Sequence, residues 1–286
     1  NIFIAIKGKR YNGHNFSNEA IKNGARYCVV SKKIKNKKKM ILVKNTFNFL
    51  NEFAKNFRNL SMSKFIAITG SSGKTTVKTM LGNLLNHYDN TFFSPYSFNN
   101  HFGVPLSICN MRSNHNYGVF EIGMNKPGEI FKLSSLVKPH FGVITNISEA
   151  HLENFKNIEG IAKAKSEIIY NIQKGGTVIL NRDDKFFNYF KNIAKKNKIL
   201  VKSFGYSKKS NIKFIHLKKI KKYFLLKVLV DSEYISFKIN NNNNSHVMNI
   251  LCCLAVLKEL SLNLNKIKNI FKDQVSLSGR GKIYKI

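Results

Sequence analysis

A glycine-rich run directly after an apolar segment is the strongest chemical signal in the sequence. It reads Gly70-Ser71-Ser72-Gly73-Lys74-Thr75-Thr76 and follows the apolar residues 65–69. When a strand leads through such a loop into a helix, exposed backbone N–H groups and the helix dipole favour a bound phosphate. Lys74 can reach the β- and γ-phosphates of a nucleotide, and the Thr75 and Thr76 hydroxyls can bind phosphate or Mg²⁺. The run therefore predicts a nucleotide-binding P-loop that uses all of these residues.

The spacing of this loop differs from the common G-x-x-x-x-G-K-[ST] pattern, because Ile68 stands where the first glycine would be. A chance Gly-Lys-Thr after a strand is the plain alternative, but here strand, loop and helix follow in the expected order. The shortened Gly-x-x-Gly-Lys-Thr-Thr form resembles the Mur ligase family, which also includes the folylpolyglutamate synthetases.

Further segments extend this resemblance over nearly the whole chain and in family order. They are residues 3–8 with 12–16, 97–106, 121–130, 145–147 with 150–153, and 161–168. The asparagine pair in 97–106 and the Pro-Gly-Glu-Ile continuation in 121–130 resemble the members that add D-alanyl-D-alanine, and sister ligases are expected to differ there. The resemblance implies an ATP-dependent ligase of peptidoglycan synthesis. It would join D-alanyl-D-alanine to UDP-N-acetylmuramoyl-tripeptide through an acyl phosphate.

Acidic and imidazole side chains after two strand ends could hold Mg²⁺. Glu121 ends an apolar strand, where its carboxylate can bind the ion directly or through water. His151 follows the next strand end, so both can converge on the crevice at the carboxyl edge of a parallel sheet. A solvated glutamate and a structural histidine are the plain alternatives. The resemblance implies that both are catalytic Mg²⁺ ligands, together with the hydroxyls of Thr75 and Ser94, and that Lys74 is catalytic.

Lys165 would be an ordinary surface lysine on sequence grounds alone. In the Mur family the equivalent lysine is typically carbamylated by CO₂ and becomes a carboxylate-like Mg²⁺ ligand, and the resemblance implies this catalytic role for Lys165. Unmodified, its cation would repel the metal, so the site must favour the neutral amine. Lys163 lies two residues earlier and would face elsewhere on the helix.

Polar side chains near strand ends and in loops are the candidates for substrate contacts. Asn181 ends an apolar strand and resembles the family's contact to the nucleotide base, whereas an Asx turn is the plain alternative. The acidic pair Asp183 and Asp184 could serve the ribose or hold the loop. A nucleotide role at Ser245 and His246 stays open. By resemblance, muramoyl-peptide contacts fall to Asn99, Asn100 and His101, and uridine-diphosphate contacts to Asn12, Gly13 and His14.

These side chains need an α/β framework to bring them together. From Lys64 onward apolar strands and helices alternate, which predicts a central P-loop domain with a mostly parallel sheet flanked by helices. Residues 200–240 predict an added antiparallel hairpin, and a small α/β domain precedes the P-loop domain. Strands are expected at 65–69, 117–122, 140–145 and 177–180, and helices at 47–60, 74–87, 159–172 and 247–260.

The expected domains are a partial UDP-muramoyl-binding domain at 1–60, a central ATP-binding domain at 61–278, and the start of a C-terminal ligase domain at 279–286. The chain begins with Asn1 and ends soon after a Gly279-Arg280-Gly281 turn. We therefore expect a fragment that lacks the extreme N-terminus and the C-terminal domain. The latter would bind the incoming D-alanyl-D-alanine.

The charge balance is strongly basic, with 48 Lys and Arg against 15 Asp and Glu and a net charge of +33. Such a balance suggests nucleic acid or an anionic membrane as partner. The lysines are spread over the whole chain, however, so compositional drift with anionic small substrates is favoured over a nucleic-acid surface. The four cysteines lack CxxC spacing, which argues against disulfides and zinc and fits a cytoplasmic protein. No apolar run reaches about 18 residues, so no membrane span is expected.

The implied cofactors are ATP, two Mg²⁺ ions and the carbamate on Lys165, and a monomer is expected. Three alternatives stay open: another amino-acid ligase of the same family, a basic P-loop protein that binds nucleic acid, and a nucleotide-binding fragment without catalysis. The sequence does not distinguish diaminopimelate from lysine in the tripeptide.

Overall fold

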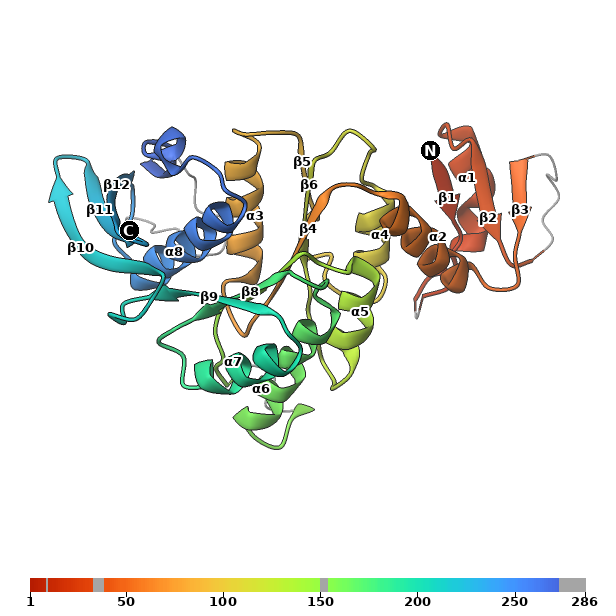
Figure 1. Cartoon of the computed structure of the whole chain (residues 1–286). Coiled ribbons are helices and arrows are strands. Elements are labelled where there is room, and N and C mark those ends of the chain that lie inside the picture. The colour runs from red at the N-terminus through yellow and green to blue at the C-terminus, as the bar shows by residue number, and fades with distance from the viewer. Residues whose placement is uncertain (9, 33–38, 150–153, 273–286) are drawn as a thin grey trace, which may run out of the picture. The chain divides into compact units, whose positions relative to one another are not determined.

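The computed structural model describes residues 1–8, 10–32, 39–149 and 154–272 (Figure 1). The chain divides into two compact units, Asn1–Leu60 and Ser61–Ile286. We refer to them as the N-terminal unit and the large unit.

The N-terminal unit contains a three-stranded parallel sheet in the order β1-β2-β3. Its strands are β1 (Ile2–Ile4), β2 (Tyr27–Val30) and β3 (Met40–Leu42), and its helices are a 3-10 turn (Gly13–Phe16), α1 (Ser17–Lys22) and α2 (Thr46–Leu60). Ala5, Cys28 and Val30 are buried at the centre of this unit, and Phe3, Ile21 and Met40 are among the residues that pack against them. Asn12, Gly13 and His14 follow β1, and the Gly13 amide donates a hydrogen bond to the Ile6 carbonyl at 2.9 Å.

The large unit is built on a nine-stranded sheet in the order β12-β11-β10-β9-β8-β7-β4-β6-β5. Neighbouring strands from β5 to β10 run parallel, whereas β10, β11 and β12 pair antiparallel. The predicted mostly parallel α/β fold is thereby confirmed. The strands are β4 (Lys64–Thr69), β5 (Thr91–Phe93), β6 (Tyr117–Glu121), β7 (Phe141–Ile144), β8 (Thr177–Asn181), β9 (Leu200–Gly205), β10 (Ile212–Ile220), β11 (Tyr223–Val230) and β12 (Glu233–Ile239).

Helices cover both faces of this sheet. On one face α3 and α8 pack against each other and against Ile66, Ile68 and Val143, which form the main core. Figure 1 shows α6 and α7 on the opposite side of β8 and β9 from α8. The α-helices are α3 (Lys74–Leu85), α4 (Gly103–Cys109), α5 (Glu129–Val137), α6 (Ile158–Ser166), α7 (Phe187–Lys196) and α8 (Asn244–Glu259), and the 3-10 helices are η4 (Glu167–Asn171), η5 (Leu264–Ile267) and η6 (Ile270–Lys272).

Two expectations about these elements need correction. The stretch 200–240 is not only a hairpin, because β9 extends the parallel sheet beside β8 and antiparallel pairing begins between β10 and β11. The helix α7 returns the chain from the end of β8 to the edge of the sheet where β8 begins. The next strand, β9, therefore runs parallel to β8. The helix expected over 159–172 is α-helical only to Ser166 and continues as the 3-10 helix η4.

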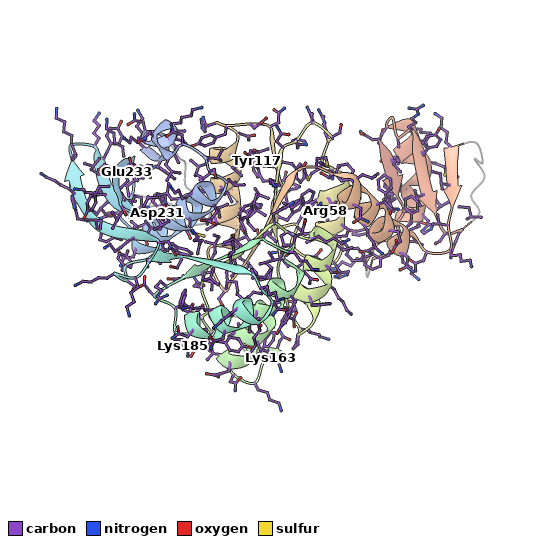
Figure 2. All side chains as sticks on the ribbon, viewed as in Figure 1. Arg58, Tyr117, Lys163, Lys185, Asp231 and Glu233 are labelled. Atoms are coloured by element: carbon purple, nitrogen blue, oxygen red, sulfur yellow. The ribbon has the colours of Figure 1, made fainter. Side chains whose placement is uncertain are left out.

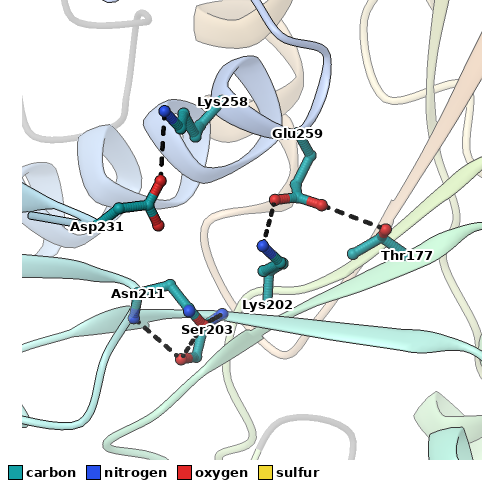
Figure 3. A network of polar contacts seen from close by, with 7 residues as sticks. All are labelled: Thr177, Lys202, Ser203, Asn211, Asp231, Lys258 and Glu259. Carbon is teal, nitrogen blue, oxygen red and sulfur yellow. Dashed lines mark hydrogen bonds and ion pairs between the residues drawn. The ribbon is translucent and has the colours of Figure 1, made fainter.

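Polar contacts fasten the C-terminal end of α8 to the sheet (Figure 3). The Glu259 carboxylate pairs with Lys202 on β9 at 3.0 Å and accepts a hydrogen bond from Thr177 on β8 at 3.4 Å. Lys258 pairs with Asp231, between β11 and β12, at 3.3 Å. These contacts fix α8 along the sheet, and its opposite end borders the cavity described below. Within the described part of the chain, no helix has the length and apolar character that crossing a membrane requires.

Candidate active site

A cavity of about 820 Å³ lies at the carboxyl ends of the parallel strands. The P-loop after β4 borders it, together with the ends of β6 and β8 and the start of α8. Of the predicted site residues, the lining contains Ser71, Ser72, Gly73, Lys74, Thr75, Thr76, Asn99, Glu121 and Asn181. The structure therefore brings the predicted nucleotide loop and two predicted metal ligands, Thr75 and Glu121, to a single cavity.

The P-loop has the shape that its glycines permit. Gly70 and Gly73 have φ angles of 147° and 78°, which L side chains rarely adopt. A Cβ atom on Gly70 would lie 1.9 Å from Thr145 Oγ1. Lys74 begins α3, and its Nζ donates hydrogen bonds to the carbonyl oxygens of Gly70 at 2.7 Å and Ser71 at 3.3 Å. The ammonium thus lies within the curve of the loop.

A polar segment after β7 holds the P-loop from the side, and we call Thr145, Asn146 and Ser148 the brace. Thr145 Oγ1 donates to the Ser72 carbonyl at 2.6 Å. Asn146 accepts from the Ser72 amide through Oδ1 at 3.0 Å and from the Ser71 amide through its carbonyl at 2.9 Å. Ser71 Oγ donates to the Ser148 carbonyl at 3.0 Å. Sequence reasoning missed this role, since only the strand order places β7 beside β4.

Glu121 is a buried carboxylate with one oxygen satisfied. Its side chain ends β6 at 1% exposure, and Oε1 accepts a hydrogen bond from Asn99 Nδ2 at 2.8 Å. Oε2 has no hydrogen-bond partner among the described residues, and Lys78 Nζ lies 4.0 Å from it. The backbone amide of Glu121 donates to Ser94 Oγ at 3.3 Å. An unsatisfied buried carboxylate oxygen at a cavity fits the expected Mg²⁺ ligand.

Two lysines of α6 have opposite environments. Lys165 is 2% exposed, whereas Lys163 is exposed (Figure 2), as their predicted positions on different helix faces require. Burial, with a smaller contribution from the charge of Lys74, lowers the pKa of Lys165 to about 7. The neutral form of the Lys165 amine is therefore populated near neutral pH. His151, the other expected ligand of this region, lies outside the described residues.

Asn181 forms the Asx turn that was the plain alternative for it, and its contact to a nucleotide base stays a prediction. Its side chain borders the cavity, and its Oδ1 accepts from the Asp183 amide at 3.0 Å in an Asx turn. The Asp183 carboxylate accepts from the amides of Tyr206 at 2.6 Å and Ser207 at 2.9 Å. Asp184 accepts from the Ile147 amide at 2.7 Å, and burial raises the pKa of its carboxyl. The acidic pair thus holds loops, including the segment that carries the brace.

Asn100 and His101 do not border the cavity. Asn100 Oδ1 accepts from the amides of Phe102 at 3.1 Å and Gly103 at 2.9 Å, which starts α4. His101 is exposed, and its ring centroid lies 4.1 Å from that of Phe102. Their assignment to the muramoyl peptide stays a prediction.

In the N-terminal unit, Asn12, Gly13 and His14 form one corner. Ser31 donates its amide to His14 Nε2 at 2.9 Å, so Nδ1 carries the proton and donates to Asn12 Oδ1 at 2.8 Å. Burial and the nearby charge of Lys32 lower the pKa of His14. A Cβ atom on Gly13 would lie 2.7 Å from the Ile6 nitrogen, so only glycine fits there. The corner presents a neutral imidazole with a defined tautomer.

The run of asparagines after β12 forms another wall of the cavity. The wall consists of Asn240, Asn241, Asn243, Asn244, Ser245, His246 and Asn249. His246 Nε2 is buried without a hydrogen-bond partner among the described residues, and burial lowers the pKa of this ring. Asn249 lies against the P-loop, because a Cβ on Gly73 would be 2.9 Å from its Oδ1. Ser245 and His246, for which the sequence left a nucleotide role open, thus border the cavity, and that role stays a prediction.

Comparison with known proteins identifies the family. A model of the Mur ligase middle domain matches residues 68–257. A UDP-N-acetylmuramoyl-tripeptide--D-alanyl-D-alanine ligase from Rickettsia prowazekii is 37% identical over 288 residues, which are 100% of this chain and 64% of that protein. A crystal structure of MurF from Acinetobacter baumannii has a TM-score of 0.88 and 30% identity, over 100% of this chain and 62% of the other.

A MurF ligase from Thermotoga maritima in complex with ADP has a TM-score of 0.84 and 26% identity, over 100% of this chain and 65% of the other. The chain thus spans less than two thirds of the length of these relatives. With most of its length matched by the family model and all of it by a relative, the chain belongs to the Mur ligase family and contains that family's middle domain.

Proposed function

We propose that the protein is an ATP-dependent ligase that joins D-alanyl-D-alanine to UDP-N-acetylmuramoyl-tripeptide. The observation that carries the proposal is the meeting of a P-loop and the buried carboxylate of Glu121 at one cavity. The name of the Rickettsia relative supports the choice of substrates.

The chemistry needs a leaving group and charge neutralisation. The terminal carboxylate of the tripeptide attacks the γ-phosphorus of ATP, the bond to the β-phosphate oxygen breaks, and ADP leaves. The amine of D-alanyl-D-alanine then attacks the acyl carbonyl carbon, loses a proton, and expels phosphate. Lys74 and the amides at the start of α3 would neutralise the phosphate charge as it moves. None of these steps requires a protein nucleophile.

Glu121, Thr75 and Ser94 are the described residues that would hold Mg²⁺. No cluster of three or more His, Cys, Asp or Glu side chains occurs among the described residues. This suits Mg²⁺, which commonly takes one or two carboxylates and completes its shell with water and substrate phosphates. Bound Mg²⁺ would neutralise and orient phosphate oxygens. A second ion with His151 as ligand stays part of the proposal.

We also propose the carbamate on Lys165. A buried amine with a pKa of about 7 is neutral in a substantial fraction of molecules near neutral pH, and only the neutral amine reacts with CO₂. The product is an anion that would balance the cation of Lys74. The base contact of Asn181, the uridine contacts of Asn12, Gly13 and His14, and a C-terminal ligase domain from residue 279 belong to the same proposal.

The test is phosphate release by the complete gene product with ATP, Mg²⁺, UDP-N-acetylmuramoyl-tripeptide and D-alanyl-D-alanine, each omitted in turn. We expect release only when both the tripeptide and the dipeptide are present. Lys74→Ala should abolish release, and Lys163→Ala, at an exposed lysine, should leave it unchanged. Release with another amino acid would change the substrate but keep the reaction class. ADP binding without any substrate-dependent release would refute the ligase proposal.

A further inference from the structure

Lys78 is a buried lysine to which the proposed mechanism gives no role. It lies one turn after Lys74 on α3 and is 1% exposed. Its Nζ donates a hydrogen bond to the Tyr96 carbonyl and lies 4.0 Å from Glu121 Oε2, with both of the paired side chains 2% exposed. A buried ammonium is costly unless charge and hydrogen bonds compensate it, so these contacts must offset a large desolvation penalty.

Tyr96 belongs to a loop that is held in an unfavourable shape. We call residues 94–102, between β5 and α4, the acceptor loop. Tyr96 has a φ of 45°, a left-handed conformation that L residues rarely adopt, and its side chain is 83% exposed. Since the exposed ring gives the loop little packing, the hydrogen bond from Lys78 to the Tyr96 carbonyl is an important restraint on this conformation.

The same loop also contacts Glu121 directly. Asn99 Nδ2 donates to Glu121 Oε1 at 2.8 Å, and the Asn99 carbonyl accepts from the Gly123 amide at 2.9 Å. Ser97 and Asn99 border the same cavity as the P-loop. Asn99 therefore contacts Oε1 of the Glu121 carboxylate, and Lys78 lies near Oε2. At 4.0 Å, Lys78 balances the charge on Oε2 without forming a hydrogen bond to it.

We propose that Lys78 is a positioning residue that ties the acceptor loop to Glu121 and to the P-loop helix. Through the Tyr96 carbonyl it sets where the loop presents the tripeptide carboxylate, and through Glu121 it leaves Oε2 available at the cavity. This inference rests on the proposed function, because it assigns the acceptor loop to the tripeptide. Lys78 itself touches neither substrate.

Lys78→Met tests this role, because methionine keeps much of the apolar stem but removes the charge and the donor. In the complete gene product we expect the KM for UDP-N-acetylmuramoyl-tripeptide to rise about tenfold or more. The Kd for ADP should stay within about twofold, since the brace and Lys74 hold the P-loop without Lys78. Lys163→Met is the matched control and should behave as the unsubstituted protein.

Amide hydrogen exchange gives a readout that does not depend on catalysis. Residues 94–102 should exchange about tenfold faster in Lys78→Met, whereas the first turn of α3 should not change. If the unsubstituted protein lacks ligase activity, the proposed function fails, but faster exchange of the loop would still support the tie. If Lys78→Met does not fold, Lys78→Leu, which also removes both the charge and the donor, carries both measurements.

An unchanged KM together with unchanged loop exchange would overturn the inference. A uniform loss of stability, with equal effects on ADP affinity and on the KM for the tripeptide, would also overturn it, because Lys78 would then only fill space. Rescue of loop exchange in Lys78→Gln, which keeps a donor without the charge, relative to Lys78→Met would support the hydrogen bond to Tyr96 as the main restraint.

Discussion

Three lysines of the large unit show how local environment changes the chemistry of one side-chain type. Lys74 lies in the curve of the P-loop, Lys78 is balanced by Glu121, and Lys165 is buried with a pKa of about 7. The sequence predicted Lys74 from its motif and Lys165 from a resemblance. It gave no indication of Lys78, because the partner of that lysine lies on β6, more than forty residues away along the chain.

Replacement of Lys165 by arginine tests the carbamate. A guanidinium keeps its proton in proteins, so it cannot react with CO₂. We expect Lys165→Arg to lower kcat about 100-fold or more while the Kd for ADP changes less than about threefold. With ¹³C-labelled CO₂, NMR should detect a carbamate carbon in the unsubstituted protein but not in the variant. Lys163→Arg, at the exposed neighbour, should retain both the activity and the signal.

The tautomer of His14 predicts a pH effect in the N-terminal unit. Protonation of Nε2 would direct an N–H group at the Ser31 amide, so the fold favours the neutral ring and the pKa lies below 6.5. Because the pKa in the folded state is lowered, the stabilisation is present above pH 6.5 and is lost as the pH falls through that pKa. NMR titration of the His14 ring measures the value directly. A pKa at or above 6.5 would contradict the prediction, and His14→Gln should remove this pH dependence.

At the level of helices and strands, the order of strands in the sheet determines contacts that the sequence alone did not predict. The apolar run and glycines predicted β4, the P-loop and α3, because hydrophobic pattern and turn chemistry are local. The brace was missed, since Thr145 and Asn146 act only through the pairing of β7 with β4. The direction of β9 was likewise hidden, because alternating residues do not distinguish parallel from antiparallel strands.

Two threonine-to-valine substitutions separate the brace from general packing. Thr145 Oγ1 donates to the Ser72 carbonyl, whereas the buried Thr69 Oγ1 has no partner among the described residues. We expect Thr145→Val to cost about 1–2 kcal/mol of unfolding free energy and to weaken ADP binding about tenfold. Thr69→Val should be neutral or stabilising, because it removes an unsatisfied buried hydroxyl. Thermal unfolding and calorimetric titration with ADP measure both effects, and equal losses in the two variants would rule out a specific role for the brace.

For the whole molecule, the α/β class and the alternation of elements could be predicted, because both follow from hydrophobic periodicity along the chain. The wall of asparagines could not, since its residues reach the cavity only after α8 folds back over β8 and β9.

The net charge of +33 allows a direct test of the nucleic-acid alternative. A polycation binds nucleic acid at low salt through counterion release, and such binding falls steeply as salt rises. The ligase proposal expects no binding tighter than about 10 μM at physiological salt, while ADP binding persists. Fluorescence anisotropy with labelled DNA and RNA at low and at physiological salt measures this. Sub-micromolar binding at physiological salt would favour a nucleic-acid function.

The brace has a thermodynamic consequence for the arrival of a nucleotide. Ser71 and Ser72 donate their amides to Asn146, so contacts within the protein itself hold this part of the loop in its shape. A preformed loop loses little conformational entropy on binding. The heat-capacity change of ADP binding should therefore match the surface that the ligand buries, without the larger negative value that accompanies coupled folding.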